Sequence, residues 1–206
     1  MRVPAGSPRR IAPAMHGDAI AGLAAAARRR YVGRMTRLGL LAAAIALGGA
    51  ASAIAATPAV ETLGTFQDWS AYAYTDSGRK VCFVQSKPKD SLPKGTKRST
   101  INALVTHRPA ERAVDVISMI MGYPLKPGSE VEIEVDNRGF KLFVDKETAW
   151  ARDSTTDRAI TDAMVKGTKL VVKGVSARGT KTTDSYSLSG FGAAHAAITK
   201  SCDVKR

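Results

Sequence analysis

An all-β fold, either a β-sandwich or a partly open barrel, is what the sequence predicts for the chain after residue 56. From about residue 66 onward, short segments rich in β-branched and aromatic residues follow one another, separated by Gly, Pro, Asp and Asn. Such spacing is typical of short strands joined by turns. Only two stretches show a helical period instead. We therefore expect about eight strands and one or two short helices.

The region before this domain has the features of an export signal. An apolar run over residues 38–53 follows two arginines and ends in the small residues Ala51-Ser52-Ala53. A basic segment, an apolar core and small residues at the cleavage site define a secretory signal peptide. We therefore assign residues 1–56 to a leader and signal peptide, with Met35 as the expected true start. The mature protein is then expected in the periplasm, at the cell surface or secreted.

Two other interpretations of the leader are open. The stretch Arg28-Arg29-Arg30-Tyr31-Val32 loosely resembles a twin-arginine signal within a longer basic region. Alternatively, residues 38–56 are just long enough to form an uncleaved membrane anchor, although they are rich in Ala and Gly. Under the signal-peptide interpretations the only membrane contact is through the export signal.

Charge narrows the class of partner. The chain has 206 residues and a formal net charge of +13, but residues 1–53 contribute eight Arg and one Asp to that total. Residues 54–206 contain 23 basic and 17 acidic side chains, spread among one another. A mature chain of about 150 residues suits a single domain. Its mild excess of positive charge is ordinary for the surface of a soluble protein. The sequence has no stripe of basic residues of the kind that would indicate nucleic-acid binding.

Two cysteines, Cys82 and Cys202, are the only ones in the sequence. An even pair in an exported chain predicts a disulfide, with two free thiols as the alternative. No Cys-x-x-Cys pair occurs and neither Cys lies near a His in the sequence, so thiol redox chemistry and a zinc site are not expected.

The first part of the domain is expected to be a linker, a hairpin and a loop. Residues 57–65 are predicted as the linker that precedes the domain at 66–206. Residues 66–74 alternate in polarity and are followed by an Asp-Ser-Gly turn and a second apolar segment, 80–86, which contains Cys82. Residues 87–99 contain two Pro and five Lys or Arg, which indicates an exposed loop.

Four strands are predicted in the middle of the domain. Residues 101–107 and 114–122 are apolar, and the second of these is expected to be buried on both faces of a sheet. Residues 130–136 alternate between Glu and Val or Ile, which predicts one buried face and one exposed face. An Asn-Arg-Gly turn then leads into a returning strand over 140–144.

The last third of the domain contains both predicted helices. Residues 153–167 have an Asp-Ser start, apolar residues at helical spacing and a final Gly. Strands are predicted at 169–176 and 184–189, on either side of a polar bend at 177–183. A closing helix over 190–200 would carry Cys202 back to the strand that contains Cys82.

Several short segments, in the order in which they occur along the chain, resemble the invasion-associated locus B family of exported proteobacterial proteins. They are Asp68-Trp69, Val81-Cys82, Ser86-Lys87-Pro88-Lys89, Thr106-His107-Arg108-Pro109, Gly122-Tyr123-Pro124, Ser176-Ala177-Arg178-Gly179-Thr180, Ser187-Leu188-Ser189-Gly190-Phe191 and Cys202. The resemblance extends over roughly residues 64–203. It implies a small immunoglobulin-like β-sandwich in the periplasm or at the cell surface, and it supplies no catalytic residue. Gln67 stands where the family has Gly, which argues against a tight turn at that position.

Basic residues are the candidate partner-binding groups. They are Lys87, Lys89, Lys94, Lys97, Arg98, Arg108 and Arg178. They would bind a protein or an anionic polymer of the envelope or host surface, and such binding should weaken as salt increases. The alternative is an ordinary solvated loop and a plain hairpin turn.

The sequence predicts no catalytic, metal or cofactor site. His107 and His195 do not occur in a His-Glu-x-x-His or His-x-His pattern. A triad of Ser189, His195 and Asp184 can be written down, but Ser189 lacks the Gly-x-Ser-x-Gly setting of a hydrolase. We therefore expect a non-enzymatic envelope protein, with a periplasmic hydrolase or a structural accessory factor of the envelope as alternatives.

Two tryptophans are the largest side chains of the domain. Trp69 and Trp150 are expected to pack in or against the core, and a stacking platform for a ligand is the alternative.

Overall fold

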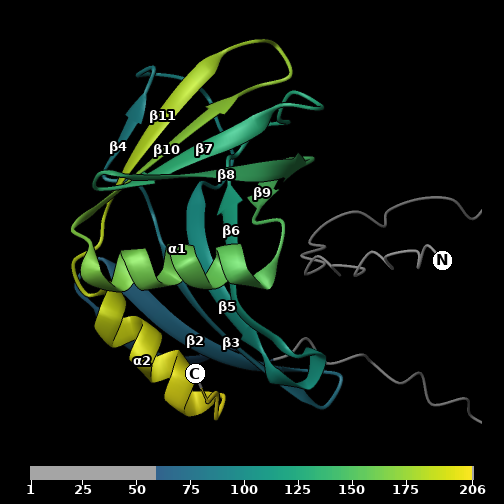
Figure 1. Ribbon diagram of the computed structural model, residues 1–206, viewed down its shortest axis with the longest axis vertical. Helices are drawn as coiled ribbons and strands as arrows, with labels where there is room; N and C mark the ends of the chain where they lie inside the picture. The colour runs from purple at the N-terminus through teal and green to yellow at the C-terminus, as the bar shows by residue number, and fades with distance from the viewer. Residues whose placement is uncertain (1–58, 206) are drawn as a thin grey trace, which may run out of the picture. The chain divides into compact units, whose positions relative to one another are not determined.

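The computed structural model describes residues 59–205 (Figure 1). The predicted leader and signal peptide, the expected start at Met35 and both alternative interpretations of the leader lie outside the described residues. Within residues 59–205, no helix is long and apolar enough to cross a membrane.

One continuous antiparallel sheet contains all eleven strands of the described residues. Its strand order is β1-β2-β3-β5-β6-β9-β8-β7-β10-β11-β4. The strands are β1 (Glu61–Phe66), β2 (Trp69–Asp76), β3 (Arg79–Ser86), β4 (Asp90–Leu92), β5 (Asn102–Arg108), β6 (Ala113–Ile120), β7 (Glu130–Val135), β8 (Arg138–Asp145), β9 (Thr148–Trp150), β10 (Lys169–Val175) and β11 (Lys181–Ser187). The predicted all-β, sandwich-like class is confirmed, and its strands are linked by hydrogen bonds from end to end.

Two helices, α1 (Ser154–Lys166) and α2 (Phe191–Ser201), lie beside one another against the sheet (Figure 1). The Asp153 side chain caps α1 by accepting a hydrogen bond from the backbone N–H of Thr156 at 2.8 Å. Helix α1 packs mainly on β6, and α2 packs on β1, β2 and β3. Both predicted helices are confirmed; a short 3-10 turn, η1 (Pro109–Glu111), lies between β5 and β6.

Alternation along the strands separates an inner face, toward the core and helices, from an outer face. In β2, Trp69, Ala71 and Ala73 are buried, while the intervening side chains are partly exposed. In β7, Val131, Ile133 and Val135 point inward and the three glutamates point outward, as predicted. The prediction that β6 is buried on both faces holds only in part: on its outer face Ser118 is buried, whereas Val116 and Ile120 are half-buried. One contiguous apolar core results.

Three short or edge strands were not predicted. Residues 61–65, expected in a linker, form most of β1, and β4 lies within the segment expected to be a loop. Strand β9 has three residues, too few for alternation to be recognised. A tight turn joins β1 to β2, with Gln67 at a left-handed φ of 52°. The expectation that Gln67 disfavours such a turn is therefore wrong, although Gly would adopt this φ at lower cost.

Candidate functional site

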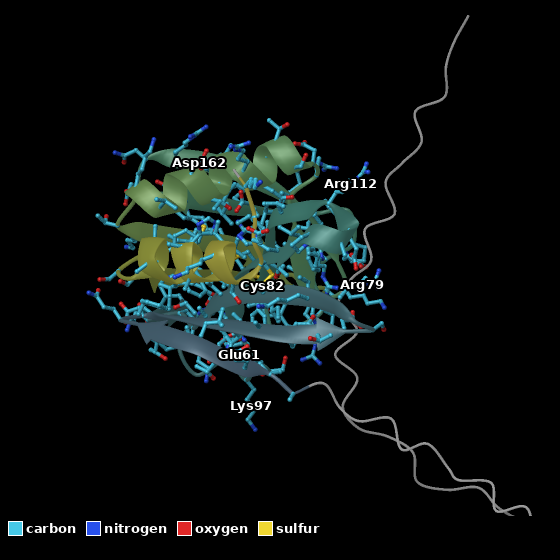
Figure 2. The ribbon with its side chains drawn as sticks, turned by 90° about the horizontal axis from the view of Figure 1, so that it is seen from below. Glu61, Arg79, Cys82, Lys97, Arg112 and Asp162 are labelled. Atoms are coloured by element: carbon cyan, nitrogen blue, oxygen red, sulfur yellow. A yellow bond between two sulfur atoms is a disulfide. The ribbon has the colours of Figure 1, made fainter. Side chains whose placement is uncertain are left out.

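The basic edge, which we define as residues 87–97, forms the end of the sheet. Its strand β4 pairs with β11, where Leu92, Ser91 and Asp90 lie opposite Thr183, Asp184 and Ser185. Four lysines are exposed on this segment: Lys87, Lys89, Lys94 and Lys97. Figure 2 shows the Lys97 side chain reaching away from the body of the domain. The four lysines thus flank a short hydrogen-bonded strand, two on each side of it.

Two of these lysines already have carboxylate partners. Lys89 forms an ion pair with Asp68, and Lys94 forms one with Asp90. Hydrogen bonds from these ammonium groups hold the pKa of each carboxyl below its usual range. Among the described residues, no carboxylate lies within ion-pair distance of Lys87 or Lys97. The basic edge therefore has a net positive charge that other parts of the domain do not neutralise.

Arg98, predicted as an exposed partner-binding residue, is buried. Its side chain is only 4% exposed and Asp184 is fully buried. The guanidinium donates two hydrogen bonds of 2.7 Å, one to each carboxylate oxygen of Asp184, and two more to the Met121 carbonyl at 2.9 and 2.6 Å. It also lies over the ring of Tyr123. Arg98 thus anchors the end of the basic edge and does not present its charge to a partner.

Arg108 and Arg178 have opposite environments. The Arg108 side chain is 11% exposed, donates a hydrogen bond to the Tyr74 hydroxyl at 3.0 Å, and lies 3.5 Å from Asp76 and 3.6 Å from Glu111. These contacts leave little of the Arg108 side chain exposed, and its role in partner binding stays a prediction. Arg178 is exposed in the tight turn between β10 and β11 and stays a candidate.

The predicted disulfide between Cys82 and Cys202 is confirmed. Cys82 lies on β3, and Cys202 follows the last residue of α2, with a Cα–Cα distance of 6.0 Å. In the β3–β5 register Cys82 lies opposite His107. The disulfide therefore ties the C-terminal end of the domain to β3, an interior strand of the sheet.

A buried polar cluster lies next to this disulfide, formed by His107, Asp115 and His195. A β-bulge on β6, where Asp115 has a left-handed φ of 59°, turns the Asp115 side chain toward the core. His195 Nε2 is 2.8 Å from Asp115 Oδ1. His107 Nδ1 accepts the backbone N–H of Asp115 at 3.1 Å, and its Nε2 is 3.2 Å from the Thr199 hydroxyl.

The hydrogen-bond directions decide what this cluster can do. The Thr199 hydroxyl donates to the His195 carbonyl at 2.8 Å, so it accepts from His107 Nε2. His107 is then neutral, with its proton on Nε2 and its Nδ1 lone pair engaged. Two His and one carboxylate within 4.8 Å form a common metal-ligand set, but His107 would have to give up these bonds to ligate. As arranged, the cluster joins α2 to the bulge on β6.

The triad considered from the sequence is not assembled. His195 contacts Asp115, Asp184 is paired with Arg98, and Ser189 donates a hydrogen bond to the side chain of Gln67. Asp115 was not among the predicted residues, although a single acid within an apolar strand is the signal that could have identified it.

The two tryptophans have different environments. Trp69 is fully buried, donates its indole N–H to the Ser187 carbonyl at 2.9 Å and packs edge-on against Phe191. Trp150 is partly exposed on the outer face of the sheet.

Comparison with known proteins identifies relatives of the chain. A sequence model of the family described as "Invasion associated locus B (IalB) protein" matches residues 69–199. The crystal structure of invasion associated protein B from Bartonella henselae is similar in fold, with a TM-score of 0.50 and 15% sequence identity. That similarity covers 69% of this chain and 98% of the other. None of the curated proteins matches the chain.

Proposed function

Because the chain belongs to the invasion associated locus B family, we propose that it is an exported, non-enzymatic protein of the cell envelope or surface that binds an anionic partner through its basic edge. The observation that carries this proposal is the set of four exposed lysines on a segment fixed by β4 and by the buried Arg98. The partner is a protein or an anionic polymer of the envelope or host surface.

The fixed position of the segment favours binding. A flexible loop loses conformational entropy when it binds, whereas a segment already ordered by its own domain loses less. Here β4 is hydrogen-bonded to β11 on one side, and the Arg98–Asp184 pair lies at the end of the segment. The lysine ammonium groups can then meet an anionic partner without first ordering the backbone.

Export is supported by the leader and by the disulfide. Disulfides persist in oxidising compartments such as the periplasm and the cell exterior. The pairing of Cys82 with Cys202 agrees with folding in such a compartment. The signal peptide predicted over residues 1–56 would deliver the domain there.

Charge reversal tests the proposal. The double variant Lys87→Glu/Lys97→Glu changes two exposed lysines that lack an ion pair, so the fold should be kept. We expect it to elute from immobilised lipopolysaccharide and from immobilised heparin at much lower salt than the wild-type domain, because screened charges drive the binding.

The matched control is Arg158→Glu/Lys205→Glu, which makes the same change in net charge at exposed residues elsewhere. It should elute close to the wild type. Equal loss of retention in both variants would mean that net charge alone acts, and unchanged retention of the Lys87→Glu/Lys97→Glu variant would refute the role of the basic edge.

A further inference from the structure

A hollow of about 390 Å³ opens on the outer face of β7, β8 and β10. Its floor includes Gly139, which lies opposite Glu134 in the β7–β8 register and contributes no side chain. Its polar walls are Glu132, Glu134, Lys141 and Lys173. The missing side chain at Gly139 therefore leaves a space between charged neighbours on this sheet face.

Two aromatic rings continue this surface along β8. Phe143 points to the same side as Gly139 and Lys141, since alternate residues of a strand share a face. Trp150 on β9 is its cross-strand neighbour, and both side chains are partly exposed. The four residue steps from Gly139 to Phe143 span about 13 Å. We name this surface, from the hollow to Trp150, the outer strip.

The charges of the outer strip balance one another. Two glutamates of β7 pair with three cations, at 3.0 Å (Arg152–Glu130), 3.3 Å (Lys141–Glu130) and 3.5 Å (Lys173–Glu134), and the third outward-facing glutamate, Glu132, lies opposite Lys141 in the β7–β8 register. The cations are 51–66% exposed, so their donors are accessible to a ligand. Hydrogen bonds from Arg152 and Lys141 lower the pKa of Glu130, which keeps this carboxyl ionised as an acceptor.

This arrangement suits a different ligand from that of the basic edge. A polyanion gains little from a surface without net charge. An array of interleaved donors and acceptors matches ligands that have many hydroxyl groups, each of which can both donate and accept. Half-exposed aromatic rings offer an apolar plane for the C–H face of a ring. Sugars combine these two properties.

We propose that the outer strip binds a short stretch of a neutral polysaccharide. A sugar ring stacks on Trp150 and Phe143, and hydroxyl groups of the neighbouring units enter the hollow above Gly139. There they donate to the glutamates of β7 and accept from Lys141 and Lys173. The inference does not depend on the basic edge, so either can fail without the other.

The two tryptophans make the test specific. The domain is titrated with three soluble neutral oligosaccharides, chitotetraose, cellotetraose and maltotetraose, while tryptophan emission and its quenching by acrylamide are recorded. Trp69 is fully buried, so a change should report on Trp150. We expect at least one of the three to give a saturable change, to protect Trp150 from acrylamide and to bind equally well at low and high salt.

A substitution at Gly139 tests the hollow without disturbing the fold. A Cβ built at Gly139 meets no atom within 4 Å, and its backbone is not left-handed. Gly139→Val should therefore keep the melting temperature and weaken sugar binding about tenfold or more, as expected when ring and hydroxyl contacts are lost. Tyr72→Ala removes an aromatic ring from β2 on the same sheet face and should leave the affinity unchanged.

Three results would overturn the inference. They are the absence of a saturable change with all three sugars, an unchanged affinity in Gly139→Val, and an affinity that falls steeply with salt. The last result would mean that the outer strip is a charge ladder that binds ions and not hydroxyl groups.

Discussion

Replacing Arg98 with methionine tests how the basic edge is held in place. The Arg98 side chain is 4% exposed, and its guanidinium is the ion-pair partner of Asp184, which is fully buried. It also donates two hydrogen bonds to the Met121 carbonyl. In the Arg98→Met variant the Asp184 carboxylate loses this cation and the carbonyl loses these donors, while the aliphatic part of the side chain is roughly preserved.

The expected decrease in the free energy of unfolding of Arg98→Met is large for a domain of this size. Removing one partner of a buried ion pair costs about 3–5 kcal/mol, because the other charge is left buried without compensation. The total free energy of unfolding of such a domain is roughly 5–15 kcal/mol. Replacing both partners by apolar residues removes the unpaired charge. The free energy of unfolding of Arg98→Met/Asp184→Leu should therefore fall by much less than the sum of the decreases in the two single variants.

Urea unfolding of the four proteins, followed by circular dichroism, measures this coupling. We expect a coupling free energy above about 2 kcal/mol between the two positions. Hydrogen exchange should also become faster at residues 90–92 in Arg98→Met, while β2 and β3 keep their protection, because the pair anchors the end of the basic edge. Single variants that each lose less than about 1 kcal/mol, or that add within about 0.5 kcal/mol, would refute the reasoning.

Three further predictions concern the rest of the domain. Gly190→Ala should lower the free energy of unfolding by roughly 3 kcal/mol or more in thermal unfolding, since its Cβ would lie 1.9 Å from the Phe66 carbonyl oxygen at a φ of 86°. Gly179→Ala, at a φ of 84° with open space around it, should lower it by only about 1 kcal/mol. Equal losses in the two variants would contradict this. Reducing the disulfide, which joins residues 120 apart, should lower the free energy of unfolding in urea by about 5 kcal/mol, and an unchanged midpoint would contradict it. Hydrogen bonds from Thr168 lower the pKa of Asp136 below 3.8. The stability that this carboxylate contributes is therefore complete above pH 3.8 and is lost as the pH falls through the pKa of the folded state. An Asp136 carboxyl that titrates at or above 3.8 by NMR would contradict this.

The features predicted correctly are those that depend on local pattern. The alternation over residues 130–136 specifies which side chains of β7 face the core, because successive strand residues point to opposite faces. The cap at Asp153 and the helical spacing behind it specify α1 in the same way. The disulfide was predictable because the domain contains one pair of cysteines and the sequence before it predicts export.

The candidate sites depended on contacts between residues far apart in the chain. In the sequence, Arg98 is indistinguishable from the exposed cations near it. Its burial depends on Asp184, 86 residues away, which lies on the strand that pairs with β4. In the same way, the hollow above Gly139 exists only because β7, β8 and β10 are neighbours in the sheet.

By itself, therefore, the sequence determined the all-β class, most strand faces, both helices and the covalent link, since each follows from periodicity or composition. The tertiary structure alone decided which cations are buried, which are exposed and which side chains meet across strands. The physical reason is that alternation specifies the face to which a side chain points, whereas its partner depends on which strands pair.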